Sequence, residues 1–117
     1  MKAPPDDLAF FSLFEVEPTL IDPDAPWIYN TATYQTERDG YQVKLEISPS
    51  YSSLKATLTF EGREIAEAEV TSFTGLEIDM DGGREALVVR FGDADASAVV
   101  LTLKPHVRLT MIASSDC

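Results

Sequence analysis

The sequence predicts an all-β fold: an antiparallel β-sandwich or flattened barrel of about eight strands, arranged as a hairpin-rich meander. Three observations predict this class. From about residue 28 onward, apolar residues recur at every second position, which is the period of a strand with one buried face. Glycine-containing turn sequences separate these runs. Turn signals also recur roughly every ten residues, the spacing typical of sandwiches and barrels.

The N-terminal segment LAFFSLFEV, residues 8–16, is rich in aromatic side chains and is predicted to be buried. Two conformations fit it, a short helix capped by Asp6 or Asp7 and a strand.

The stretch IDPDAPWIYN, residues 21–30, contains two prolines that stiffen the chain and hold the preceding residues extended. If a strand begins there, Trp27 and Tyr29 share one side. We favour the hypothesis that Trp27 plugs the end of the core at a corner of the fold. The alternative is a recognition corner, in which Trp27 and Tyr29, flanked by Asp22 and Asp24, contact a partner.

Most of the remaining chain alternates between apolar and polar residues. The alternating runs are YQVKLEIS (41–48), LKATLTF (54–60), LEIDM (76–80) and HVRLTMI (106–112). REIAEAEV (63–70) has helix-favouring alanine and glutamate, but its alternation predicts a strand. ALVVRF (86–91) and AVVLTL (98–103) are almost continuously apolar, which predicts central strands covered on both faces.

Turns of the type RDG (38–40), EGR (61–63) and DGG (81–83) predict three hairpins, because each places glycine where positive φ is needed. The length of 117 residues predicts a single β domain spanning residues 1–117. Cys117 is the only cysteine, the N-terminus is a poor signal peptide, and no apolar run approaches the roughly 20 residues of a membrane span. We therefore expect a cytoplasmic, soluble protein.

The formal net charge of −11 argues against nucleic-acid and anionic-membrane partners, since both require a positive face. The negative charge is concentrated in residues 1–37 and 61–85, each of which sums to −6. Solubility is the ordinary explanation, and attraction of a basic partner is the alternative. If segments 64–70 and 76–80 lie side by side, four carboxylates gather on one sheet face: Glu67, Glu69, Glu77 and Asp79.

Residues suited to catalysis are few, and we predict no enzyme, no cofactor and no metal. His106 and Cys117 are the only histidine and cysteine, which excludes a closed zinc site and leaves no evident nucleophile–base pair. Ser52 and Lys55 have an S-x-x-K spacing that works only on a helix, whereas Lys55 belongs to an alternating run. Two aspartate clusters could supply calcium ligands, but hairpin chemistry explains them better: Asp79 with Asp81, and Asp93 and Asp95 with Ser97.

Three hypotheses for function remain, in decreasing order of preference. The first is a small acidic binding protein, inhibitor- or immunity-like, that engages a basic protein partner through a carboxylate-rich sheet face. The second is a structural or accessory β subunit that self-associates, with its acidity serving solubility. The third is an enzyme with an unfamiliar carboxylate site. The predicted partner-binding residues are Asp22, Asp24, Trp27, Tyr29, Glu67, Glu69, Glu77 and Asp79.

Overall fold

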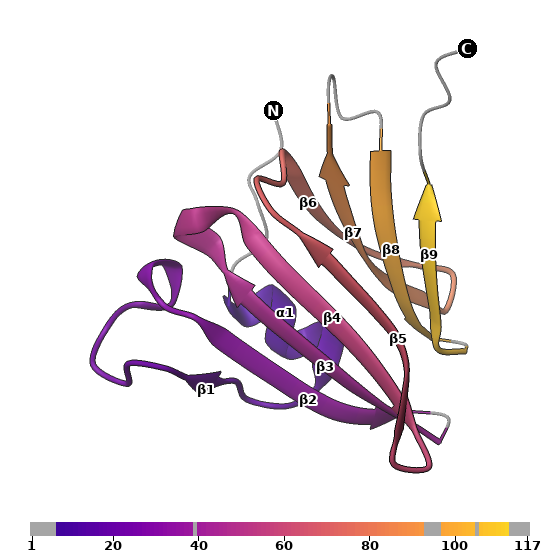
Figure 1. Ribbon diagram of the computed structural model, residues 1–117. Helices are drawn as coiled ribbons and strands as arrows, with labels where there is room; N and C mark the ends of the chain where they lie inside the picture. Colours follow the sequence, from indigo (N-terminus) through magenta and orange to yellow (C-terminus); the bar gives the residue numbers. More distant parts are fainter. Residues whose placement is uncertain (1–6, 39, 93–96, 105, 113–117) are drawn as a thin grey trace.

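The computed structural model describes residues 7–38, 40–92, 97–104 and 106–112, and it shows two antiparallel sheets packed face to face (Figure 1). Sheet A has the order β1 (Thr19–Leu20), β2 (Ala32–Arg38), β3 (Tyr41–Ser48), β4 (Ser53–Phe60) and β5 (Arg63–Val70). Sheet B has the order β6 (Gly75–Asp81), β7 (Arg84–Phe91), β8 (Ser97–Lys104) and β9 (Arg108–Ile112). The helical elements are α1 (Asp7–Phe14) and the 3₁₀ turns η1 (Trp27–Tyr29) and η2 (Pro49–Tyr51).

The predicted all-β class and meander are confirmed, and of the two predicted architectures the sandwich is the one observed. In both sheets, neighbours in space are neighbours in sequence. The described residues form nine strands, where about eight were expected. The additional strand is β1, whose two residues are too few to show an alternating pattern in the sequence.

The predicted hairpins form at the expected glycines. Arg38 pairs with Tyr41 at the first, and the second turns through Glu61 and Gly62, with φ values of 51° and 78°. The third turns through Gly82 and Gly83, with φ values of 61° and 85°. Consecutive positive φ values give the turn the twist that the flanking strands require.

The ambiguous segment REIAEAEV is strand β5, as predicted. Its alanines pair with apolar residues of β4, Ala66 with Leu58 and Ala68 with Ala56, so tertiary pairing overrides the helical propensity of the segment. The register shifts between Leu58 and Thr59, and this irregularity coincides with an exposed Ile65.

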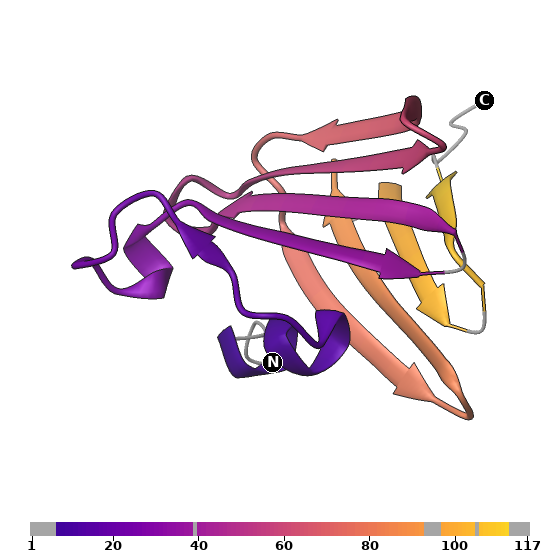
Figure 2. The same cartoon turned by 90° about the horizontal axis from the view of Figure 1, so that it is seen from below.

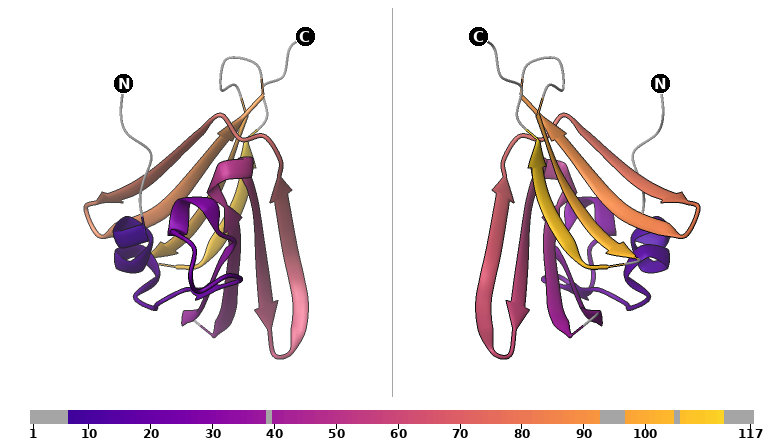
Figure 3. Two further views of the ribbon diagram at one scale, coloured as in Figure 1. Left: turned by 90° about the vertical axis from the view of Figure 1, so that its left-hand side faces the viewer. Right: turned by 90° about the vertical axis from the view of Figure 1, so that its right-hand side faces the viewer.

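The N-terminal aromatic segment is a helix, so of the two conformations considered the helical one is observed. Figures 2 and 3 show α1 at the open side of the sandwich, where it contacts β2 of sheet A and β6 of sheet B. Phe10, Leu13 and Phe14 are fully buried there, each stabilising the fold by about 2 kcal/mol. The ring of Tyr34 stacks with both phenylalanines, with centroid distances of 5.6 Å to Phe10 and 5.3 Å to Phe14.

Strands β7 and β8 are central in sheet B, as predicted, but only one of their faces is covered by another layer. Their inward residues, among them Leu87 and Leu101, belong to the core. On the opposite face, Ala86 and Val100 are buried although no helix or sheet of the described residues lies over them. These short side chains are shielded by longer neighbours on the same face rather than by a packed layer.

Among the described residues, the structure contains no helix with the length and apolar character needed to span a bilayer.

Candidate protein-binding surface

Asn30 organises the loop formed by residues 21–30. It is 4% exposed and is the one buried polar residue in the described part of the chain. Its Nδ2 donates to the carbonyl oxygens of Asp22 at 2.5 Å and Ala25 at 3.0 Å. Its Oδ1 accepts from the backbone N–H groups of Asp22 at 3.1 Å and Thr31 at 3.0 Å. One side chain thus joins both ends and the middle of the loop, which fixes its shape.

Trp27 lies against the core, the position that the corner hypothesis favours. Its ring centroid is 5.5 Å from that of Phe10, and its Nε1 donates to Oη of Tyr34 at 3.0 Å. The condition under which Trp27 and Tyr29 would share one side is not met, because these residues lie in the 3₁₀ turn η1 and the next strand begins only at Ala32. Tyr29 therefore faces away from the core and is 72% exposed.

Tyr29 belongs to an exposed apolar group at one end of sheet A. Turns η1 and η2 lie close to each other at this end of the molecule (Figure 1). Tyr51 is the last residue of η2 and is 80% exposed. We define the exposed corner as six exposed residues of this end: Ile21, Asp22, Asp24, Ile28, Tyr29 and Tyr51. Sequence reasoning missed Tyr51; an aromatic residue within the polar turn SPSYSS was the only available signal.

The aspartates of the corner are held in place by a local turn. The backbone N–H of Asp24 donates to Oδ1 of Asp22 at 3.1 Å, and both side chains are exposed. Both are negatively charged residues beside exposed isoleucine and tyrosine, the combination found where an apolar anchor has a polar rim.

The outer face of sheet A, opposite the core, carries most of its charge as carboxylate. Lys44 and Lys55 are the two cations of this face. Five glutamates outnumber them and leave a net charge of −3 (5 − 2): Glu37, Glu46, Glu64, Glu67 and Glu69. Within the described part of the chain, one ion pair involves them, Lys55 Nζ to Glu67 Oε2 at 3.6 Å, and both side chains of that pair are about 40% exposed. Shallow hollows of about 300 and 380 Å³ run across this face.

Glu77 and Asp79 do not join the glutamates of β5. The loop 71–74 carries the chain from β5 in sheet A to β6 in sheet B, so the four carboxylates predicted to gather lie on two separate sheets. Glu77 is 3.5 Å from Arg90, and Asp79 is 3.2 Å from Arg84. Each of these acids is therefore balanced by an arginine of β7, whereas Glu69 has no cationic partner closer than 4.0 Å among the described residues.

Among the described residues, those considered for catalysis or metal binding are not brought together. Ser52 follows η2 in a left-handed conformation with φ 53°, and Lys55 lies on β4, so the helical S-x-x-K geometry is not formed. Within the described ranges, no group of three or more His, Cys, Asp or Glu could hold a metal ion. Asp93, Asp95 and Cys117 lie outside the described residues.

Comparison with known proteins gives a likeness of fold. No protein-family model matches the sequence, and no curated protein matches it. The structure is similar to a chain of a contact-dependent growth inhibition toxin–immunity protein complex from Klebsiella pneumoniae 342, with a TM-score of 0.76 and 16% sequence identity. The superposition covers 92% of each chain. At this identity, the two chains are shown to share the two-sheet fold.

Proposed function

We propose that this chain is a non-enzymatic, immunity-like or inhibitor-like protein that binds a basic protein partner. The binding surface consists of the outer face of sheet A together with the exposed corner. The observation that carries the proposal is the excess of carboxylates on this face, at whose end exposed tyrosines and isoleucines are clustered.

The two parts of the surface adjoin through the register of sheet A. Glu46, Lys55 and Glu69 lie side by side across β3, β4 and β5. This row is close to the end of the sheet where η2 joins β3 to β4. A partner lying on the glutamates can therefore also reach Tyr51.

Each part has a different physical role in binding. Exposed carboxylates attract a basic partner over a distance of about one Debye length, roughly 8 Å at physiological salt, and accelerate association. Tyrosine and isoleucine supply the apolar area that slows dissociation, and tyrosine is among the residues enriched in binding hot spots. Because Asn30 already fixes the loop, little conformational entropy is lost when the corner is bound.

The structural likeness supports a protein partner, because the similar chain comes from a complex of a toxin with an immunity protein. The basic character of the partner is supported by the net charge of −11 and by the acidic face of sheet A.

Paired charge reversals on the two outer faces test the proposal. A basic protein that this chain retains at low salt and releases at high salt would be titrated by surface plasmon resonance. We expect Glu67→Lys with Glu69→Lys to slow association and weaken binding by about tenfold or more. The matched control, Glu77→Lys with Asp79→Lys, changes the net charge equally on sheet B and is expected to bind nearly normally. Equal losses in both variants, or no loss in either, would contradict the assignment to sheet A.

A further inference from the structure

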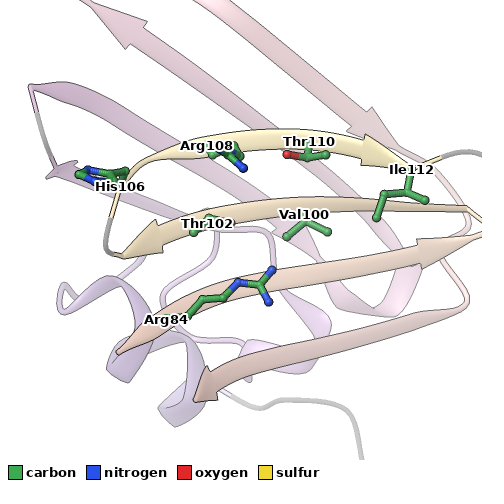
Figure 4. A pocket seen from close by; sticks show the side chains of 7 residues that line it. All are labelled: Arg84, Val100, Thr102, His106, Arg108, Thr110 and Ile112. Carbon is green, nitrogen blue, oxygen red and sulfur yellow. The ribbon is translucent and has the colours of Figure 1, made fainter. Parts of the chain in front are cut away.

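The outer face of sheet B carries a third hollow, and the charged side chains that line it are cationic, whereas the outer face of sheet A is mainly acidic. The hollow has a volume of about 400 Å³ and lies over β7, β8 and β9 (Figure 4). Val100 and Ile112 contribute apolar surface, and Thr110 contributes a hydroxyl group. Arg84, His106 and Arg108 contribute the ionisable side chains, and none of the residues lining the hollow is acidic.

The two arginines of the hollow differ in their contacts with the protein's own carboxylates, because Arg84 already has one as a partner. Arg84 is 51% exposed and its guanidinium lies 3.2 Å from Asp79 on the edge strand β6. Figure 4 shows its side chain extending from β7 toward Val100 on β8. Arg108 is exposed and forms no ion pair with a described residue. A positive site is thus retained on a chain whose net charge is −11.

The floor of the hollow continues an apolar strip that has no covering layer. Ala86, Ala98 and Val100 face outward from the two central strands and are not part of the core cluster. Sequence alone predicted these strands to be covered on both faces, and the described residues cover one. The strip itself is buried beneath its neighbours, and the accessible apolar side chain beside it is Ile112, which is 53% exposed, so an apolar side chain of a partner would contact Ile112.

The pairing of β8 with β9 makes the hollow a groove that runs along these two strands. Thr102 lies beside Arg108, and Val100 beside Thr110, so the lining residues form two parallel rows. From Arg108 to Ile112 the row is about 13 Å long, at roughly 3.3 Å per residue. An extended segment of about five residues spans that length, and its groove-facing side chains are two residues apart.

We propose that this groove binds an extended acidic segment of a partner protein. A carboxylate of the segment pairs with Arg108 and shares Arg84 with Asp79, and an apolar side chain two to four residues further along lies over Ile112. The carboxylate and the apolar side chain of the segment must be separated in this way, because Arg108 is at one end of β9 and Ile112 is at the other. Arginine suits this role, because its planar guanidinium can bind a carboxylate through two hydrogen bonds. This site is independent of the basic-partner surface on sheet A.

A short acetylated peptide provides the test. In the probe peptide, one glutamate and one valine stand two residues apart, and threonine fills the other positions. The comparison peptide has lysine in place of the glutamate. The ¹⁵N-labelled protein is titrated with each. We expect the glutamate peptide to shift the amide resonances of β8 and β9 and the lysine peptide to leave them unchanged. Because a chain of −11 repels an acidic peptide over most of its surface, confined shifts identify a specific site.

Variants and an anion control separate this proposal from its competitors. Arg108→Glu is expected to weaken peptide binding at least tenfold, and the milder Arg108→Gln tests the same contact if the reversal unfolds the protein. Arg63→Glu, at an exposed arginine of sheet A, is the matched control and should bind normally. The proposal is overturned if the peptide shifts sheet A instead, if neither peptide binds, or if inorganic phosphate produces the same shifts and displaces the peptide.

Discussion

Replacing Asn30 by alanine is the most informative perturbation of the loop formed by residues 21–30. The substitution removes four hydrogen bonds at once, those to Asp22 N–H, Asp22 C=O, Ala25 C=O and Thr31 N–H. It leaves the strands and the aromatic core untouched, since Asn30 is absent from the apolar core cluster. Any loss of stability therefore measures how far this side chain holds the loop.

The magnitude follows from the number and location of these bonds. Each net hydrogen bond contributes about 1 kcal/mol, so the four set an upper value near 4 kcal/mol. Asp22 is exposed, so water can rehydrate part of what is lost. We expect a decrease of about 2 kcal/mol in the free energy of unfolding, equivalent to a fall in Tm of roughly 6–12 °C for a chain of this size.

Chemical denaturation and hydrogen exchange measure the two consequences. Urea unfolding monitored by circular dichroism gives the free energy, and exchange of the amides of residues 21–31 should accelerate in the variant. Gln35→Ala, at an exposed residue of β2, is the control and should change stability by no more than about 0.5 kcal/mol. If Asn30→Ala lowers the free energy of unfolding no more than this control does, and the loop amides exchange as before, the idea that Asn30 preorganises the loop is refuted.

Three further predictions concern single contacts. Trp27→Phe keeps an aromatic ring near the core but loses the 3.0 Å hydrogen bond of the indole, so we expect a loss of about 1–2 kcal/mol in urea unfolding; an unchanged midpoint would contradict this bond. Gly40→Ala should lower the melting temperature more than Gly62→Ala does. Both glycines have positive φ (82° and 78°), but only at Gly40 would the new methyl group approach another side chain, that of Phe60, at 3.3 Å. Equal melting temperatures for the two would show that this contact relaxes freely. Tyr51→Ser should leave stability within about 0.5 kcal/mol while weakening partner binding, and a large drop in the melting temperature would instead assign Tyr51 to the fold.

Much of the fold follows from local patterns in the sequence. Alternation identifies β3, β4 and β5 and assigns Glu67 and Glu69 to the solvent side, because side-chain direction in a strand depends only on parity. The hairpins are equally local, since positive φ at Gly62 or Gly83 requires no information from distant residues. The excess of acid is a property of composition and needs no structure at all.

Tertiary structure alone decides which elements meet. Nothing between Val70 and Gly75 marks a change of sheet, yet that change separates Glu69 from Glu77 and divides the predicted carboxylate patch. The proximity of η1 and η2 likewise joins Tyr29 to Tyr51 across more than twenty residues. Parity along a strand is fixed by the covalent chain, whereas the pairing of strands and turns depends on which packing buries the most apolar surface over the whole chain.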